Sequence, residues 1–354
     1  MNKTTVLCMF GGKSTEYEVS LMSAFSILSN IDREKYDVIT LGITKDGKWL
    51  YYDGDPESIK NGSWHRKNVC SAMLVPDFGC KKLCVNSNPA RFIDIDVVFP
   101  VMHGAFCEDG KLQGLLEICG LPYVGPNCLS SAVSMDKVYT KLVLNNFDIP
   151  QAQYIYFTDA EIRKNIQECI LKAEDIFSYP MFVKPANAGS SIGTAKAGNT
   201  DELISALKLA AGFDSKIIIE EYIQGKEIEV AVMGNDEIIV SPCGEINPGS
   251  DYYDYDTKYK TDTSSTHIPA SIPADVAEKV RSYAGKIYKS LGCFGLSRVD
   301  FFVCENGRIV FNEINTLPGF TNISMYPKLF MHTGLSYSEI IDKLITLAIK
   351  SKDN

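Results

Sequence analysis

The first 125 residues alternate short apolar runs with segments of helical spacing, and this alternation constrains the fold more than any other feature. The runs Thr4–Phe10, Tyr36–Ile43 and Ile93–Val101 predict buried strands. A glycine turn follows the first run, and acidic residues then open a segment with apolar positions at helical spacing, which predicts a helix. Strands that alternate with helices are typical of a parallel α/β sheet. We therefore expect an N-terminal α/β domain with a parallel sheet over residues 1–125.

Two further domains are expected after this one, because 354 residues are the length of two or three domains of about 100–200 residues each. We expect them over residues 126–219 and 220–354. The second is predicted to contain helices over Ser130–Asn146, Glu161–Asp175 and Asp201–Ala211 and strands over Met181–Pro185 and Lys216–Glu221. The third is predicted to contain strands over Glu227–Met233, Ile238–Ser241, Ser297–Cys304 and Arg308–Ile314 and helices over Ala274–Ser290 and Leu335–Lys350. The chain should therefore combine α/β and α+β units.

The charge balance excludes one broad class of function. Lys and Arg number 35 and Asp and Glu number 44, which gives a net charge of −9. A general nucleic-acid-binding protein needs a basic surface, so we expect no nucleic-acid partner. No apolar run approaches the ~20 residues of a membrane span, and the N-terminus lacks the apolar core of a signal peptide. We expect a cytoplasmic protein without a membrane partner.

The 11 cysteines are scattered and odd in number, which disfavours a disulfide framework. Cys80 and Cys84 lie four residues apart with Cys70 upstream, but no CxxC pair or nearby His completes a zinc site. Reduced thiols that pack as small apolar side chains are the favoured interpretation. Cys107 is the candidate for an exposed thiol near a functional site.

Polar side chains in two apolar segments near the C-terminus carry the strongest functional signal. Arg298 and Asp300 alternate in one predicted strand, and Glu313 and Asn315 alternate in the next. Residues two apart point to one face of a strand, so three oxygen ligands and a guanidinium can share a surface. Carboxylate and amide oxygens that leave room for phosphate and water suit Mg²⁺. The alternative is an ordinary salt bridge on a solvated sheet face, which the apolar neighbours disfavour.

Further segments have features of a nucleotide site. Lys184 leaves a predicted strand and is followed by the small-residue loop Gly189–Gly193, whose backbone amides suit phosphate. Lys137 opens a predicted helix. The stretch Tyr252–Lys260 holds four tyrosines in a polar segment and fits a lid that excludes water. Taken alone, each feature has a simpler explanation: a connecting loop, a surface lysine and a tyrosine-rich turn.

A set of short motifs occurs in order along most of the chain. They are Glu18–Ser20, His103-Gly104 with Glu108–Gly110, Leu112–Gly114, Met135–Lys137, Val183–Pro185, Gly189–Gly193, Tyr255–Tyr259, Arg298–Asp300 and Asn312–Thr321. Each motif is loose, but the ordered set is specific and runs from about residue 6 to about residue 347. Together these segments resemble the D-alanine–D-alanine ligase family of the ATP-grasp superfamily. The resemblance implies an N-terminal α/β domain followed by two ATP-grasp domains with ATP bound between them.

The resemblance assigns residues to the nucleotide and its metal ions. The implied ATP ligands are Lys137 and Lys184 at the phosphates, Glu220 with the backbone of Glu221 and Ile223 at the adenine, Glu227 at the ribose, Lys258 at the transferred phosphate, and Ser191. Asp300, Glu313 and Asn315 are implied to bind two Mg²⁺ or Mn²⁺ ions. Whether a monovalent cation such as K⁺ assists is left open.

The resemblance also implies residues for the two amino acids. Glu18 is implied to hold the ammonium group of the first D-alanine and, with Ser190 and Tyr259, to tie the lid shut. Arg298 and the backbone N–H of Gly319 are implied to stabilise the oxyanion. The remaining implied substrate contacts are His103 and, at the second substrate, Ser324 and Met325.

The implied reaction is the ATP-dependent joining of two D-alanines through an acyl phosphate, for peptidoglycan precursor synthesis. Related ligases use D-serine or D-lactate as the second substrate. The intact Lys258-Tyr259 pair disfavours lactate, and Met325 suits a methyl group better than a hydroxymethyl group, whereas Ser14–Glu18 resembles D-serine ligases. D-alanine is therefore favoured and D-serine is the alternative. An ATP-grasp ligase for another carboxylate and a non-catalytic nucleotide-binding regulator rank lower. The family also implies a homodimer.

Overall fold

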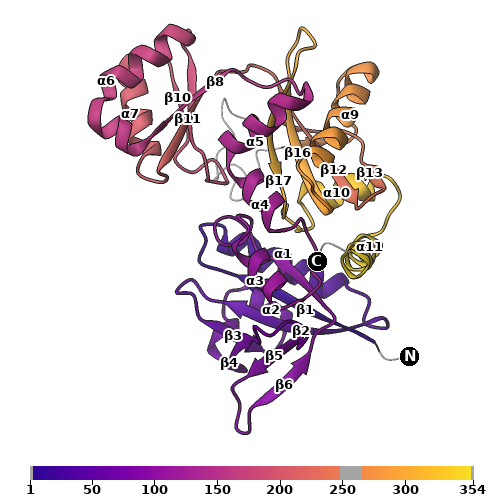
Figure 1. The fold of residues 1–354 in the computed structure, drawn as a ribbon. Coiled ribbons are helices and arrows are strands. Elements are labelled where there is room, and N and C mark those ends of the chain that lie inside the picture. The colour runs from indigo at the N-terminus through magenta and orange to yellow at the C-terminus, as the bar shows by residue number, and fades with distance from the viewer. Residues whose placement is uncertain (1–2, 248–264, 352–354) are drawn as a thin grey trace.

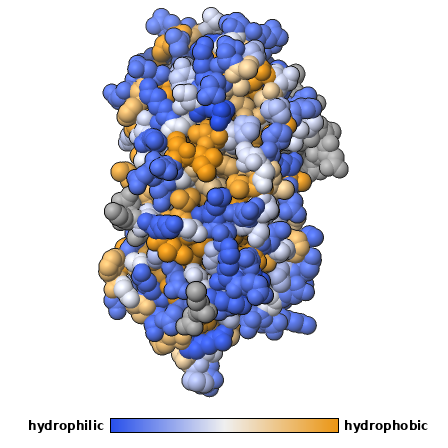
Figure 2. All heavy atoms as spheres, turned by 90° about the vertical axis from the view of Figure 1, so that its right-hand side faces the viewer, coloured by the Kyte–Doolittle hydropathy of each residue, from blue (hydrophilic) through white to orange (hydrophobic). Residues whose placement is uncertain are grey.

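Residues 3–247 and 265–351 are described in a computed structural model of the chain, and they form three β-sheets with helices packed on them (Figure 1). The N-terminal sheet, coloured indigo to purple, lies at one end of the molecule, and the middle and C-terminal sheets lie at the other (Figure 1). On the face drawn in Figure 2, hydrophobic side chains gather around mid-height, and hydrophilic ones cover most of the rest. The three sheets and the helices packed on them confirm the predicted combination of α/β and α+β units.

The N-terminal sheet has the strand order β6-β5-β4-β3-β2-β1-β7. The predicted parallel pairing joins β1 (Thr4–Gly11), β2 (Tyr36–Ile43) and β7 (Val97–Val101). The antiparallel strands β3 (Trp49–Tyr52), β4 (Val69–Leu74), β5 (Lys82–Val85) and β6 (Arg91–Asp94) extend the sheet beyond it. The helices of this part are α1 (Tyr17–Asn30), α2 (Pro56–Lys60), η1 (Trp64–Arg66) and α3 (Lys111–Ile118).

The run Ile93–Val101 was expected to be one strand, and it is two, which lie at opposite edges of the sheet. Asp96 makes the bend between them, because its carboxylate accepts the Thr5 N–H at 2.8 Å and its own N–H donates to the Thr5 carbonyl at 3.1 Å. Ile95 beside it is buried, so the apolar run continues through the bend. Hydrophobicity alone therefore does not reveal the break.

The middle sheet is antiparallel and has the order β10-β9-β11-β8. Its strands are β8 (Tyr154–Thr158), β9 (Met181–Pro185), β10 (Ala195–Ala197) and β11 (Lys216–Glu221). The amphipathic helices α6 (Asp159–Ile176) and α7 (Thr200–Ala210) pack on it and form a separate apolar core. Helices α6 and α7 do not cover the opposite face of the middle sheet. The expected boundary after residue 219 falls inside β11, so we propose that the division lies after this strand.

The C-terminal sheet has the order β15-β14-β12-β16-β17, with β13 paired to β12. Its strands are β12 (Lys226–Gly234), β13 (Ile238–Val240), β14 (Gly244–Asn247), β15 (Ser265–His267), β16 (Gly295–Val303) and β17 (Ile309–Asn315). Helix α9 (Ala274–Ser290) covers one face. Helices α10 (Met325–Met331) and α11 (Tyr337–Lys350) pack between the opposite face and the N-terminal sheet.

The predicted helix Ser130–Asn146 is interrupted at Asp136. It consists of α4 (Cys128–Met135), α5 (Lys137–Leu144) and the short η2 (Asn145–Phe147). Asp136 leaves helical geometry with φ −85° and ψ 103°, and its carboxylate accepts the N–H groups of Val138 and Tyr139. Leu144 belongs to the core of the C-terminal sheet. Part of the expected second domain therefore packs with the third.

The helices and the cysteines can also be compared with what the sequence predicted. No helix in the described ranges is both long and apolar enough to cross a membrane. All 11 cysteines are free thiols. The expectation that Cys107 is exposed is wrong, because its side chain is fully buried and burial raises the pKa of its thiol.

Candidate functional site

Two adjoining cavities occupy the junction of the three sheets. The first has a volume of about 400 Å³ and lies between the middle and C-terminal sheets. The second has about 380 Å³ and lies between the C-terminal sheet and the N-terminal unit. Lys137, Ala188, Ile246 and Glu313 line both cavities, so the two spaces meet at these residues. A molecule in one cavity can therefore touch a molecule in the other.

The first cavity collects most of the expected nucleotide residues. Lys137, Lys184, Ser191, Glu220, Glu221, Ile223 and Glu227 all line it. Phe182 from β9 and Phe302, Val310 and Phe311 from β16 and β17 supply apolar walls. Apolar walls with a few polar groups are typical of a small-molecule site. Lys258 lies outside the described residues.

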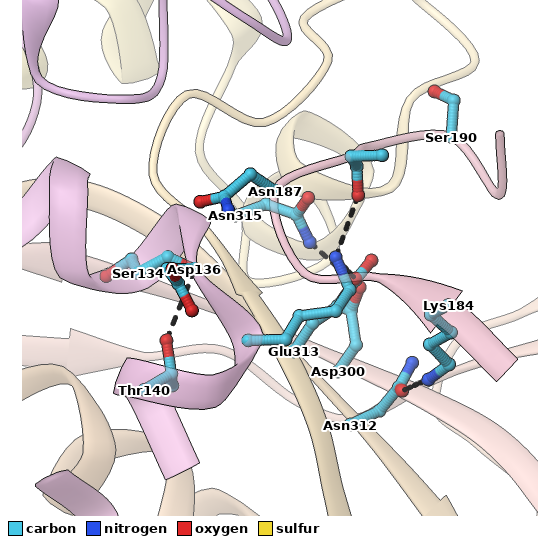
Figure 3. Close-up of polar contacts among 12 residues, drawn as sticks. Ser134, Asp136, Thr140, Lys184, Asn187, Ser190, Asp300, Asn312, Glu313 and Asn315 are labelled. Atoms are coloured by element: carbon cyan, nitrogen blue, oxygen red, sulfur yellow. Dashed lines mark hydrogen bonds and ion pairs between the residues drawn. The ribbon is translucent and has the colours of Figure 1, made fainter. Parts of the chain in front are cut away.

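Glu220 is held between two lysines at the base of this cavity. One carboxylate oxygen lies 2.7 Å from Nζ of Lys141 and the other 2.8 Å from Nζ of Lys184. Burial would raise the pKa of Glu220, but the two ammonium groups outweigh burial and lower that pKa to about 2. Lys184 also donates to Oδ1 of Asn312 at 3.1 Å (Figure 3). Lys141 was not among the residues expected from the sequence, although it lies one helical turn after Lys137 on α5.

Lys137 lies where the two cavities meet. Its Nζ donates to the carbonyl of Ala188 at 2.8 Å and lies 3.4 Å from Oε2 of Glu313. Ala188 belongs to the loop after β9, in which Ser190 and Ser191 both have positive φ values, 50° and 58°. Lys137 therefore contacts the residue directly before the loop Gly189–Gly193, and the two together form a candidate phosphate site.

The three expected metal ligands, Asp300, Glu313 and Asn315, and the expected oxyanion residue Arg298 lie side by side on β16 and β17. Asp300 pairs with Glu313 across the two strands, and Arg298 pairs with Asn315. The amide of Asn315 donates to Asp300 at 3.0 Å, as Figure 3 shows. Glu313 and Asn315 line the second cavity, whereas Asp300 lies behind them with both oxygens bound to Arg298. Two carboxylates and an amide oxygen are a donor set that suits Mg²⁺, which commonly takes one or two carboxylates and completes its shell with phosphate and water. No group of three or more His, Cys, Asp or Glu in the described part of the chain is arranged for a metal.

Arg298 points into the second cavity and is fixed by two acids. Its Nε lies 3.0 Å from Glu229, and its guanidinium donates to both oxygens of Asp300 at 2.8 and 2.7 Å. These contacts hold a planar donor group in one orientation. The expected residues Gly319, Ser324 and Met325 line the same cavity.

Of the two acidic residues at the start of α1, Glu16 and not Glu18 lines the second cavity. Glu16 is buried and accepts a hydrogen bond from the Ser190 hydroxyl. The side chain of Glu18 is 59% exposed and pairs with Lys45 instead. The expectation that Glu18 binds substrate is therefore wrong. The reason is local: α1 begins at Tyr17, so Glu16 precedes the helix and reaches the loop, whereas Glu18 lies in the first turn and faces solvent.

His103 lies in this cavity as expected, and Glu108 joins it. Nδ1 of His103 is 2.8 Å from the carbonyl of Leu317. The carboxylate of Glu108 accepts the N–H groups of Gly104 at 2.7 Å and Leu317 at 3.2 Å. Burial, with Glu16 nearby, raises the pKa of Glu108 to about 8. Glu108 lies within one of the ordered motifs, but no role was expected for it from the sequence. Tyr259 and the whole expected lid, Tyr252–Lys260, lie outside the described residues.

Known proteins resemble this chain over almost its full length. A family model described as the D-ala D-ala ligase N-terminus matches residues 5–126, and one described as the D-ala D-ala ligase C-terminus matches residues 143–346. A D-alanine–D-alanine ligase of Acetivibrio thermocellus is 49% identical over 99% of this chain and 96% of its own length. One from Caldicellulosiruptor bescii is also 49% identical, again over 99% of this chain and 96% of its own.

Solved structures agree with this similarity. The VanG D-Ala:D-Ser ligase of Enterococcus faecalis has a TM-score of 0.90 and 41% identity, and the match covers 98% of this chain and all of the other. The D-alanine–D-alanine ligase of Coxiella burnetii has a TM-score of 0.87 and 34% identity, over 99% of this chain and 94% of the other. From the matched family models, the sequence identity and the shared fold, this chain belongs to the D-alanine–D-alanine ligase family.

Proposed function

We propose that the enzyme joins two D-alanine molecules into D-alanyl-D-alanine with hydrolysis of ATP to ADP and phosphate, for peptidoglycan precursor synthesis. One observation carries this proposal: the two cavities meet at Lys137 and Glu313. A nucleotide in the first cavity can then present its terminal phosphate to a carboxylate in the second. The names of relatives at 45–49% identity over nearly the whole chain support the same reaction.

The chemistry needs two steps. A carboxylate is a poor electrophile, so the first D-alanine takes the terminal phosphoryl group of ATP and becomes an acyl phosphate, with ADP as the leaving group. The neutral amine of the second D-alanine then attacks the carbonyl carbon and a tetrahedral oxyanion forms. The oxyanion collapses, the C–O bond to phosphate breaks, and the nitrogen gives one proton to the departing phosphate as the peptide bond is completed. Arg298 and the backbone N–H of Gly319 are proposed to stabilise this oxyanion, by about 3–4 kcal/mol per donor.

Glu16 replaces Glu18 in the proposed binding of the first D-alanine. Its carboxylate lies in the second cavity and is held by Ser190. A carboxylate there attracts the substrate ammonium group, and the contact ties the phosphate loop to the N-terminal unit. Tyr259 and Lys258 remain predictions for the lid and for the transferred phosphate.

The second substrate is proposed to be D-alanine, with D-serine as the alternative. Met325 is buried and lines the second cavity beside Ser324. An apolar side chain there favours a methyl group, although a hydroxyl is discriminated by only about 100-fold or less in such a pocket. The likeness to a D-Ala:D-Ser ligase at 41% identity keeps the alternative open to test.

The bound metal ions, the oligomeric state and the cellular location are also proposed. We propose two Mg²⁺ ions, replaceable by Mn²⁺, at Asp300, Glu313 and Asn315. Bound there, they would neutralise charge on the phosphates. We also propose a cytoplasmic homodimer. A monomeric mass by light scattering would contradict the dimer, and rates measured with and without K⁺ test whether that ion assists.

One experiment decides between the acceptors. Purified enzyme is given ATP and Mg²⁺ with D-alanine alone, and then with equal D-alanine and D-serine, while phosphate release is followed and products are weighed. A dominant mass of D-alanyl-D-alanine is expected in both reactions. A dominant D-alanyl-D-serine mass would contradict the acceptor proposal. The absence of amino-acid-dependent phosphate release would contradict the ligase proposal itself.

A further inference from the structure

A buried lysine lies behind the first cavity and has no place in the proposed reaction. The side chain of Lys141 is 1% exposed, and Lys141 is not among the residues that line the cavity. Its Nζ is 2.7 Å from Glu220 and 5.3 Å from the centre of the Tyr154 ring. A buried ammonium group destabilises the fold unless it is paired, so the buried position of Lys141 needs a physical explanation.

The charges around Glu220 suggest why a lysine is buried at position 141. Lys184 lines the cavity and shares the same carboxylate at 2.8 Å. If Lys184 were the only partner, the two charges would cancel, and the lysine would have little attraction left for an anion. With Lys141 on the other oxygen, two positive charges face one negative charge. The trio therefore keeps one net positive charge next to the cavity.

We propose that Lys141 is a positioning residue that neutralises Glu220, so that the charge of Lys184 remains available to the phosphate oxygens of ATP. This inference rests on the proposed function, because it takes ATP as the occupant of the first cavity. It assigns Lys141 no contact with the nucleotide. It also explains why a carboxylate is tolerated beside a phosphate-binding lysine: its charge is already balanced from behind.

The test compares Lys141→Met with the double variant Lys141→Met/Glu220→Gln. Methionine is unbranched and only one atom shorter than lysine, and it removes the charge. The single variant should raise KM for ATP and the dissociation constant of ADP at least 10-fold, with KM for D-alanine nearly unchanged. The double variant removes both charges, and it should bind ADP more tightly than the single variant, without reaching wild-type affinity because Glu220 is itself an expected adenine contact. Lys208→Met, on the exposed side of α7, is the matched control and should behave as wild type.

Three results would overturn the inference. The first is an unchanged KM for ATP in Lys141→Met, and the second is a double variant that binds ADP no better than the single one. The third is a parallel rise of KM for ATP and for D-alanine, which indicates general damage to the fold. If Lys141→Met does not fold, Lys141→Arg, which keeps the charge, must retain wild-type ADP affinity. ADP binding is measured directly, so a wild type that binds ADP but makes no dipeptide contradicts the proposed function and leaves this test intact.

Discussion

Two acidic residues at the start of α1 have opposite environments, although only Tyr17 separates them. Glu16 is buried against Ser190, and Glu18 is exposed beside Lys45. A hydrogen bond to a charged group is worth about 1.5–3 kcal/mol, whereas an exposed ion pair is worth about 0–1 kcal/mol. The two positions should therefore respond very differently to the same substitution.

We predict that Glu16→Ala lowers kcat/KM for dipeptide formation about 10- to 100-fold, since about 1.4 kcal/mol corresponds to a factor of ten. Glu18→Ala should leave the rate within about twofold of wild type. Steady-state kinetics with varied D-alanine measure both, and each variant is the other's control. A large loss in Glu18→Ala with a normal rate in Glu16→Ala would restore the assignment made from the sequence.

Glu108 should make stability depend on pH in a defined direction. Its pKa is raised to about 8 from an ordinary 4.5, so between these values the native state holds a proton that the unfolded state has lost. Stability must then fall as pH rises through this interval, by up to about 1.4 kcal/mol per pH unit. Glu108→Gln has no proton to lose, so its free energy of unfolding should fall less steeply than that of wild type from about pH 7 to 8.

Denaturant unfolding at several pH values measures this difference in slope. Burial lowers the pKa of His103, which is therefore neutral in both states above about pH 7 and does not contribute. The slope is more informative than the absolute stability, because Gln replaces one of the two oxygens that accept backbone N–H groups. Parallel slopes for the two proteins would contradict the raised pKa.

At the scale of elements, the start of α5 contributes both to the stability of the fold and to the candidate site. Asp136 caps the helix through the N–H groups of Val138 and Tyr139 and pairs with Lys216 of β11 at 2.6 Å. The next residue, Lys137, reaches both cavities. A change at the cap should therefore affect stability and nucleotide binding together.

We predict that Asp136→Ala destabilises the protein by about 1–2 kcal/mol, as expected for a lost helix cap, and also weakens ADP binding several-fold. Asn127→Ala is the control, because Asn127 caps α4 through the N–H of Ser130 and lines neither cavity. It should show a similar loss of stability with unchanged ADP affinity. Thermal unfolding and calorimetric titration measure the two quantities. An Asp136→Ala protein with normal ADP affinity would contradict the link.

Elements differed in how well the sequence predicted them, for physical reasons. The strands β1, β2 and β9 and helix α9 agree with the prediction closely, because their apolar periodicity continues to their ends. The period of two in β16 and β17 also predicted that Arg298, Asp300, Glu313 and Asn315 lie together. The break at Asp136 was missed because helical sequence patterns lie directly before and after it, and a single aspartate between them does not reveal a break. The short antiparallel strands β3 to β6 of the N-terminal sheet have four to six residues, too few to establish a period.

At the scale of the whole molecule, the site depends on contacts between residues far apart in sequence. Glu16, Lys184 and Glu313 come from the three different sheets or their flanking loops, and only folding brings them to one junction. Helix α11 helps to hold that arrangement, because Asp342 accepts hydrogen bonds from Lys35 at 3.0 Å and from Tyr36 at 2.8 Å in the N-terminal unit. Sequence motifs named most residues of the junction, but their order along the chain carried no information on which of Glu16 and Glu18 reaches it.

This dependence predicts that nucleotide and metal stabilise the molecule as a whole. A ligand that binds only the native state adds about 2.7 kcal/mol at 100 times its dissociation constant. Mg²⁺ with ADP should therefore raise the unfolding temperature by several degrees, and Mg²⁺ alone should raise it much less. Glu313→Gln should keep most of the unliganded stability, since the Glu313 side chain is 26% exposed, yet lose most of the Mg²⁺-dependent part of the rise. Glu305→Gln, an exposed position in the turn between β16 and β17, should respond as wild type. Differential scanning fluorimetry with and without EDTA separates these cases, and an equal Mg²⁺-dependent rise in all three proteins would contradict the proposed metal site.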